Sequence, residues 1–470
     1  MTISTRILIG LLLASNAGCS LVGEYQRPDS SLPSQWKQSG AGVGVPLASQ
    51  VSWRAFFSDA RLQSLIEQAI EHNHDLLIAL ARVAETRAQL GVARADRLPS
   101  ISLLGSSAKS QIPSAFTGTD KPVTTERSDL SLSVVSYEID FWGRVANLSE
   151  SAQASYLASE AASRSLRITV ISVVANIYFS LLEMEARIEI SRAVLETRKQ
   201  SAELMRQGMV LGAAARSDYL LAESLLSSAH ADLAVLENQR DGAEHMLALL
   251  VGNPKMELPA GGKLRELDVQ HNLAAGIPSE VLYARPDVVA SENRLKEAHA
   301  NIGAARAAFL PRILLTAGLG LSSRNLAGLF GVGAGNWNFQ PSLSMPLFDS
   351  GRSASYMDIA EARKISAIAD YERTIQQAFR EVADLLSARA SLADQERATK
   401  AAGRAHQERL IVAEARFKAG TISYLEVLDA QREVLAAQLA SVLIHSAQLT
   451  NSAQLYKALG GGDTDARAGL

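Results

Sequence analysis

Residues 73–99 read NHDLLIALARVAETRAQLGVARADRLP, and residues 285–311 read RPDVVASENRLKEAHANIGAARAAFLP. The two stretches match at a constant offset (287 − 75 = 311 − 99 = 212), most clearly at Asp75, Arg82, Gly91 and Pro99. Further along, Gly143 and Gly212 return at a smaller offset (351 − 143 = 420 − 212 = 208). Each half of the chain is therefore one copy of a unit. The change of offset after Pro99 marks a loop of variable length.

The N-terminus has the features of a secretory signal, with a weakly basic start and a short apolar run over residues 7–13. Cys19 is the only cysteine, and it follows the small residues Ala17 and Gly18 as in a bacterial lipobox, although Asn16 departs from that pattern. We expect residues 1–18 to be removed and Cys19 to carry N-palmitoyl and S-diacylglycerol groups. An incidental cysteine after an ordinary signal is the alternative. A chain with one cysteine forms no internal disulfide.

Composition excludes several classes of function. The 470 residues carry a formal net charge of −3 without a basic stripe, so we expect no nucleic-acid partner. The sequence contains no nucleophile elbow or P-loop and its histidines are isolated, so we expect neither an enzyme nor a bound metal or other cofactor. We see no apolar run beyond residue 13 that is long enough for a membrane-spanning helix. Any membrane crossing would then be a β-barrel.

Alternating apolar and polar residues predict two strands in each half. They lie at residues 313–322 and 336–347 in the second copy and at residues 101–110 and 129–139 in the first. The alternation changes phase at Val135, which predicts a β-bulge. Strands of about ten residues with one polar face match outer-membrane strands, and a pair of soluble hairpins is the alternative. Trp337 and Phe339 belong either to an aromatic girdle or to a soluble core.

The longest helical pattern runs from residue 145 to about residue 211, with hardly a glycine and no proline, and returns over residues 352–418. Some 65 residues at about 1.5 Å each reach roughly 100 Å, far beyond an ordinary helix. Both helices should end at a glycine, Gly212 or Gly420. A second helix should then return, over residues 218–251 and 424–459.

Each copy is thus a helix, a strand pair, a long helix and a returning helix. We divide the mature chain into an extended arm, repeat 1, an inter-repeat linker, repeat 2 and a tail, at residues 19–60, 61–252, 253–286, 287–460 and 461–470. Four strands cannot close a barrel or leave open edges in lipid, so the chain has to oligomerise. Three chains would supply twelve strands, an even antiparallel number.

Several motifs are together highly specific: Cys19 with Tyr25-Gln26-Arg27-Pro28, Tyr137-Glu138-Ile139-Asp140 with Gly143-Arg144, Arg285-Pro286-Asp287-Val288, Pro346-Leu347-Phe348-Asp349-Ser350-Gly351-Arg352, and Gly420-Thr421 with Leu425-Glu426-Val427-Leu428-Asp429-Ala430. With these motifs the chain resembles outer-membrane efflux channels of the TolC and OprM type, in the lipidated OprM/NodT branch. The resemblance implies an α+β membrane protein and a homotrimer. Its twelve-stranded β-barrel would lie in the outer membrane of a Gram-negative bacterium and continue as a long periplasmic α-helical barrel.

Two acidic residues are candidates for a periplasmic gate. Glu426 and Asp429 lie three residues apart after Gly420, hence on one helix face, and each would form a ring of three carboxylates around a threefold axis. In the resembled family, matching acidic residues line the constriction. Asp218 is the first-copy counterpart of Glu426 (426 − 218 = 208), whereas Leu221 replaces Asp429. The alternative is that Asp429 pairs with Arg432 on an ordinary solvated helix face.

The resemblance also implies partners. Gly212, Gly420 and Thr421 mark hairpin tips that would meet a periplasmic adaptor, a membrane fusion protein, in a system with a proton-driven inner-membrane pump. The chain would then be a passive gated conduit for small toxic compounds or drugs, anchored in outer-membrane lipid. A channel for ATP-driven protein secretion is one alternative. A periplasmic coiled-coil scaffold lipoprotein without a pore is another.

Overall fold

The structure is a computed structural model that describes residues 23–29, 33, 36, 51–118, 121–256, 258, 262–267 and 278–461. The predicted signal and Cys19 lie outside the described residues, as does nearly all of the predicted C-terminal tail. The chain divides into two compact units. Unit 1 contains Met1–Asp29, Arg82–Glu160 and Ala290–Glu372, and unit 2 contains Ser30–Ala81, Ala161–Val289 and Arg373–Leu470.

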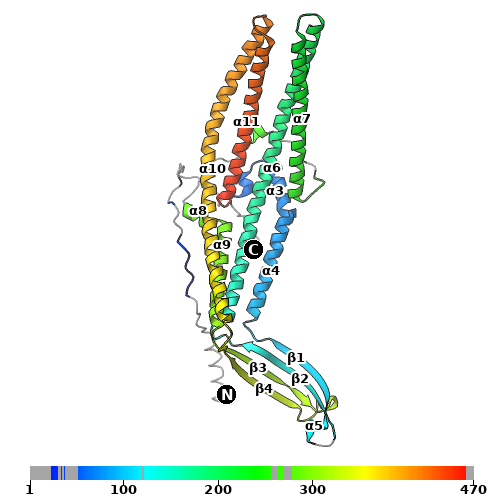
Figure 1. Ribbon diagram of the computed structural model, residues 1–470, viewed down its shortest axis with the longest axis vertical. Helices are drawn as coiled ribbons and strands as arrows, with labels where there is room; N and C mark the ends of the chain where they lie inside the picture. The colour runs from blue at the N-terminus through cyan, green and yellow to red at the C-terminus, as the bar shows by residue number, and fades with distance from the viewer. Residues whose placement is uncertain are drawn as a thin grey trace. The chain divides into compact units, whose positions relative to one another are not determined.

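Unit 1 holds a four-stranded antiparallel sheet in the order β1-β2-β3-β4 (Figure 1). Its strands are β1 Ile101–Ile112, β2 Val123–Glu138, β3 Arg312–Ser323 and β4 Gly335–Ser344. All four strands predicted from the alternation are confirmed, although β2 begins at Val123 instead of residue 129 and β4 ends at Ser344 instead of residue 347. The loops hold two short turns of helix, α5 Ser114–Thr117 and η3 Leu326–Gly328.

The predicted bulge lies in β2. Its pairing with β3 shifts between Val134 and Tyr137, and Ser136 between them has φ 54°, a left-handed conformation. The amide of Ser136 donates a hydrogen bond to Oγ1 of Thr316 on β3 instead of taking part in the ladder (3.3 Å). An extra residue in one strand turns the side chains after it to the opposite face. This explains the change of phase that the sequence shows at Val135.

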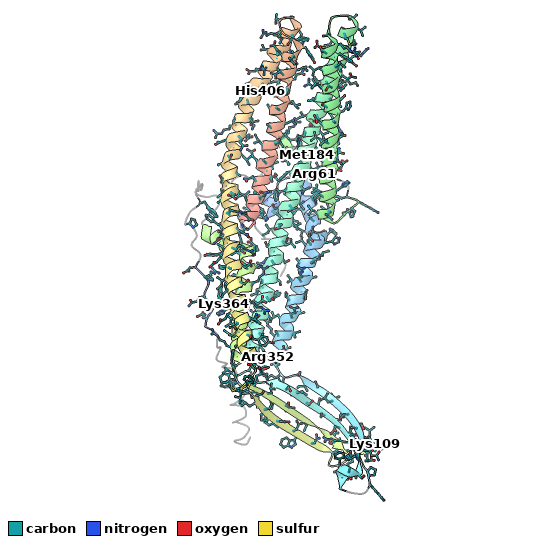
Figure 2. All side chains as sticks on the ribbon, viewed as in Figure 1. Arg61, Lys109, Met184, Arg352, Lys364 and His406 are labelled. Carbon is teal, nitrogen blue, oxygen red and sulfur yellow. The ribbon has the colours of Figure 1, made fainter. Side chains whose placement is uncertain are left out.

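Side chains of the sheet are largely exposed in this chain. Every residue of β4 is exposed, and Trp337 and Phe339 are 77% and 62% accessible. Their alternative assignment to a soluble core is therefore wrong, while the aromatic girdle stays a prediction. Polar pairs also cross the sheet: Nζ of Lys109 on β1 lies 3.4 Å from Oε2 of Glu126 on β2 (Figure 2).

The two long helices are α6 Arg144–Val210 and α10 Arg352–Lys418, with 67 residues each. Their returning partners are α7 Arg216–Val251 and α11 Tyr424–Ala458 (Figure 1). All four predicted helices are confirmed to within a few residues. In unit 2, α6 buries Val174, Tyr178 and Leu181 completely, at the three- and four-residue spacing of one helix face.

Among the helices of the described residues, α6 alone is long and apolar enough to cross a membrane by composition, with a window of mean hydropathy 1.6. Our expectation that no such run follows residue 13 was therefore wrong. More than half of that window, 56%, is buried within the chain. Buried core helices have the same composition, so we assign no membrane span to α6.

The helix predicted before the strand pair of the first copy is interrupted. It forms α3 Ala60–His72 and α4 His74–Ala95, separated at Asn73. The side chain of Asn73 caps α4, because Oδ1 accepts hydrogen bonds from the amides of Asp75 (3.0 Å) and Leu76 (3.1 Å). Its Nδ2 donates to the carbonyl oxygen of Leu250, near the end of α7 (2.9 Å). The described residues of the predicted extended arm include a short helix, α2 Trp53–Phe56.

The second half has a matching break at Arg285, between α8 Pro278–Ala284 and α9 Pro286–Ala307. Nη1 of Arg285 donates to the carbonyl oxygen of Ala458, at the end of α11 (2.8 Å). The predicted linker over residues 253–286 thus contains α8, together with the 3₁₀ turn η2 Leu264–Glu266.

Arg285 is almost fully buried, at 5% exposure, and it holds two carboxylates. Its guanidinium binds both oxygens of Asp287 (3.0 and 2.7 Å) and Oε2 of Glu381 on α10 (3.0 Å). Burial alone would raise the pKa of Asp287, but the hydrogen bond and charge of Arg285 hold it below the ordinary value. The helix break in the second half is therefore held by an ion-pair network, and the break in the first half by an amide side chain.

Residues 23–29 of the N-terminal arm belong to unit 1 and pack there on α9. Arg27 forms a two-point ion pair with Glu292 of α9 (3.2 and 2.8 Å), and the ring of Tyr25 packs edge-on against His299 of the same helix. An arm lying on other structure is what the sequence predicts, and it is confirmed for residues 23–29.

Candidate functional site

The two hairpin tips in unit 2 share one backbone geometry. Gly212 and Gly420 follow the ends of α6 and α10 with φ of 72° and 71°. The next amides, of Ala213 and Thr421, reach back five residues to the carbonyls of Gly208 (2.8 Å) and Arg416 (3.0 Å). This is the Schellman pattern of a helix C-terminus, which needs a residue with positive φ. The predicted helix ends are confirmed, and adaptor contact at the tips stays a prediction.

Tyr424, the first residue of α11, joins the two hairpins. Its ring packs against apolar clusters of both tips, and its Oη donates a hydrogen bond to Oγ of Ser201 on α6 (2.5 Å). Tyr424 was not among the residues predicted from the sequence. The available signal was a lone aromatic residue at a position where the first copy has Arg216 (424 − 208 = 216).

Asp429 is held by two arginines within its own chain. Oδ2 accepts from Arg409 of α10 (2.6 Å), and Oδ1 accepts from Arg432 one turn along α11 (2.7 Å). The hydrogen bond from Arg409 is the main cause that lowers the pKa of Asp429 below the ordinary carboxyl value. The alternative that Asp429 pairs with Arg432 is confirmed, and Arg409 is a partner that sequence reasoning missed.

Glu426 and Asp218 have different surroundings from Asp429. Both side chains are exposed. Asp218 accepts one weak hydrogen bond from its neighbour Ser217 (3.4 Å), whereas Glu426 has no side-chain hydrogen bond or ion pair among the described residues. The described contacts do not join Asp218 to either acid of α11. Glu426 is therefore an exposed carboxylate at the second tip without a counter-charge among the described residues.

This distribution of charge limits what the tip can bind. Two guanidinium groups compensate the carboxylate of Asp429, and Arg432 also pairs with Glu433, so a ring built from Asp429 would carry little net negative charge and would not attract cations strongly. Exposed carboxylates of Glu426 do not have this compensation. A cation-selective constriction would thus depend on Glu426 more than on Asp429, which sequence spacing alone does not distinguish.

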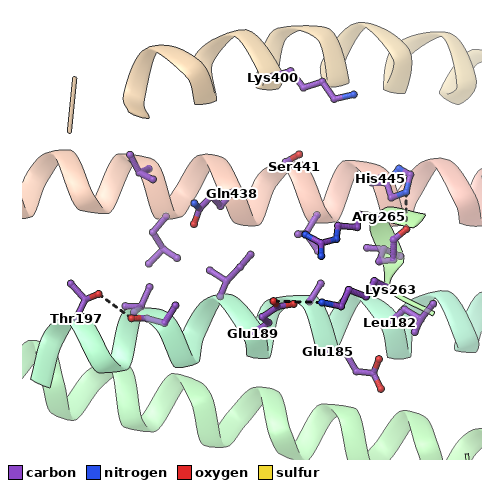
Figure 3. Close-up of a pocket in the computed structure, with 18 of the residues that line it drawn as sticks. Leu182, Glu185, Glu189, Thr197, Lys263, Arg265, Lys400, Gln438, Ser441 and His445 are labelled. Carbon is purple, nitrogen blue, oxygen red and sulfur yellow. Dashed lines mark hydrogen bonds and ion pairs between the residues drawn. The ribbon is translucent and has the colours of Figure 1, made fainter. Parts of the chain in front are cut away.

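A groove of about 1010 Å³ lies in unit 2 between α6 and α11, bordered by α10 and closed at one end by η2 (Figure 3). At that end, Nε2 of His445 donates to the carbonyl oxygen of Leu264 (3.0 Å), and Nζ of Lys263 lies 4.0 Å from Glu189. At the other end, Arg198 donates to Oε1 of Gln431 (3.2 Å). Sequence reasoning found no pocket, because a groove between two helices leaves only their usual apolar stripes in the sequence.

Comparison with known proteins gives consistent matches. A family model described as outer membrane efflux protein matches residues 65–253 and 277–461. The chain is 37% identical over 468 residues to the probable efflux pump outer membrane protein TtgC of Pseudomonas putida, covering 97% of this chain and 96% of that protein. It is 36% identical over 448 residues to the cation efflux system protein CusC of Escherichia coli, covering 95% and 96%.

A solved structure of the same kind also matches. The open state of the Neisseria gonorrhoeae MtrE outer membrane channel is 34% identical and superposes with a TM-score of 0.86, covering 94% of this chain and 98% of that one. This match spans both the strands and the long helices described above.

Proposed function

Because the chain belongs to the outer membrane efflux protein family, we propose that three copies of it assemble into one gated export channel. The chain itself is an outer-membrane component of an efflux pump, and its family consists of transporters rather than enzymes. The finer statements that follow concern its assembly, its gate and its partners.

The open edges of the sheet are the observation that best supports a trimer. It ends at β1 and β4, and both edge strands are exposed along their whole length in the single chain. In lipid, unpaired backbone groups are too costly to persist, so β4 of one copy should pair with β1 of the next. Three copies would close twelve strands. The four long helices of each copy would then supply a twelve-helix tunnel in the periplasm.

The gate of this channel would lie at the hairpin tips. We place the constriction at Glu426, with Asp429 and its two arginines next to it and Asp218 on the neighbouring hairpin. Opening would require the two hairpins of a copy to separate where Tyr424 now bonds Ser201. The lipid on Cys19 would anchor the arm in the outer membrane.

The partners would be a periplasmic adaptor at Gly212, Gly420 and Thr421 and a proton-driven pump in the inner membrane. Names of the relatives mention toluene, antibiotics, solvents and cations as exported compounds. This range supports small toxic compounds or drugs as cargo here. An ATP-driven protein exporter as the pump, or a scaffold without a pore, are the alternatives.

Crosslinking in cells tests this proposal. Photoreactive residues at Ala213 and Thr421 should capture an adaptor that copurifies with a proton-driven pump, and outer-membrane fractions should contain a trimer that dissociates on heating. Capture of an ATP-driven exporter would change the cargo to protein. Capture of neither, with no heat-labile trimer, would favour the scaffold.

A further inference from the structure

The groove between α6 and α11 has the dimensions and lining of a ligand site. It extends along residues 182–198 of α6, about 24 Å at 1.5 Å per residue, and along residues 431–445 of α11. Its volume of about 1010 Å³ is that of a large small-molecule pocket. The walls between its two ends are mainly apolar, formed by side chains such as Ala186, Ile190, Val194, Val434, Leu435 and Val442.

Arg198 is a buried cation on the wall of this groove. Only 9% of the residue is exposed, and its one side-chain hydrogen bond within the described chain goes to the neutral Oε1 of Gln431 (3.2 Å). The described residues place no carboxylate within ion-pair distance of it, in contrast to Arg285, which is equally buried and holds two. Burial lowers the pKa of Arg198, as expected for a charge without a counter-charge.

A buried guanidinium without an anion is unfavourable, since the loss of hydration is not offset by an opposite charge. The same groove is also lined by four acids, and within the described chain none of them lies within ion-pair distance of Arg198. They are Glu185 and Glu189 of α6 and Glu396 and Glu414 of α10. Gln431 fixes one donor of the guanidinium, which leaves its other donors for a planar carboxylate. At this end of the groove, the guanidinium of Arg198 therefore lacks an anionic partner among the described residues.

We propose that this groove binds an amphipathic organic carboxylate, with the carboxylate on Arg198 and the apolar body along Ile190, Val194 and Val434. An inorganic anion would leave the apolar walls unused. A side chain from a second copy is disfavoured because Arg198 is already buried by its own chain. A fatty acid from membrane lipid and a soluble organic acid share this chemistry. The site lies within one chain and does not depend on the channel proposed above.

Photolabelling of the purified full-length protein in a maltoside detergent tests the site. A dodecanoate with a diazirine in its chain should label peptides of residues 182–198 and 431–445. Free dodecanoate should compete, whereas dodecyltrimethylammonium, with the same apolar body and the opposite charge, should not. Stronger competition by 1-naphthoate than by dodecanoate would indicate a soluble acid as the natural ligand, and the reverse a fatty acid. Equal competition by the cation would overturn the proposal.

Substitutions of Arg198 distinguish the effect of losing its charge from a general effect on folding. Labelling should fall about tenfold or more in Arg198→Gln, since a charge-assisted pair is lost, and partly in Arg198→Lys. Arg192→Gln is the matched control, because Arg192 lies on the same helix but pairs with Glu237 of α7 and does not line the groove. Unchanged labelling in Arg198→Gln, or an equal fall in Arg192→Gln, would contradict the site.

Heat stability without ligand gives an independent measurement. Arg198→Met removes a buried charge that lacks a partner, so the ligand-free variant should unfold at a higher temperature than the parent and gain nothing from dodecanoate. If Glu414 instead turns inward and pairs with Arg198, both Arg198→Met and Glu414→Gln should unfold at a lower temperature. That outcome would overturn the proposal.

Discussion

The turn between α6 and α7 and the turn between α10 and α11 share their backbone but not their side chains. Matching glycines have the same positive φ, and matching amides make the same five-residue hydrogen bond. Yet the first tip has Arg216, Asp218 and Leu221 where the second has Tyr424, Glu426 and Asp429. The two tips thus share a backbone geometry, whereas the side chains that could close a constriction or select ions lie mainly on the second tip.

The same contrast recurs where each returning helix ends. Asn73 and Arg285 occupy matching positions (285 − 73 = 212) and bond the matching carbonyls of Leu250 and Ala458 (458 − 250 = 208). One contact is made by a neutral amide and the other by a buried cation with two acids. Equivalent contacts can therefore differ greatly in what their loss would cost, and this difference can be tested.

The largest effect should come from Arg285→Ala. It leaves Asp287 and Glu381 without their common cation and removes the bond to Ala458, which should cost about 3–5 kcal/mol. Asn73→Ala, its matched control, removes a cap and one backbone contact and should cost about 1–2 kcal/mol. Thermal unfolding followed by circular dichroism measures both variants. Equal losses would show that the ion-pair network adds nothing to the contact.

Alanine at Gly212 or Gly420 should have the next largest effect, and an equal one at both tips. No heavy atom lies within 4 Å of a Cβ built at either glycine, so the only cost is the left-handed backbone, about 1–2 kcal/mol. Hydrogen exchange of the tip amides measures the local opening free energy. Asparagine, which tolerates this conformation, should recover part of the loss. A clearly unequal pair of alanine variants would contradict the shared geometry.

Tyr424→Phe should weaken the contact between the two tips. It keeps the ring in both apolar clusters but removes the hydrogen bond to Ser201, at a cost of about 1 kcal/mol. The expected result is faster hydrogen exchange at the start of α11. Tyr219→Phe is the control, because the described contacts of Tyr219 at the first tip are apolar packing. The same increase in hydrogen-exchange rate in both variants would show that the hydroxyl of Tyr424 does not stabilise the tip.

Low pH should increase the mobility of the second tip, and we expect this effect to be the smallest of those compared. Because Arg409 lowers the pKa of Asp429, their pair stabilises the tip above the ordinary carboxyl range, and this contribution is lost as pH falls through the lowered pKa. A spin label at Thr421 should gain mobility on acidification, while one at Ala213 should change less. Asp429→Asn should remove the pH dependence at Thr421. Identical titrations of both labels would contradict the assignment.

Much of the fold follows from patterns that are local in sequence. Both 67-residue helices end where a glycine stops an apolar stripe, and all four strands follow from alternation, including the bulge at Val135. The cap of α4 at Asn73 is a local signal that was overlooked, whereas the bond from Asn73 to Leu250, far along the chain, does not follow from any local pattern. Arg409 was missed as the partner of Asp429 for the same reason, since a turn of the chain lies between them.

Gly320 of β3 also affects how the sheet can form. It pairs with Ser131 so closely that a Cβ there would lie 2.4 Å from the carbonyl oxygen of Leu130. A two-residue slip that brought Ser322 opposite Ser131 would force a side chain into that space. The lack of a side chain at Gly320 therefore helps to select one register between β2 and β3. Steric overlap thus disfavours a slip in this direction and keeps the β1–β2 hairpin of the first half and the β3–β4 hairpin of the second half in one register.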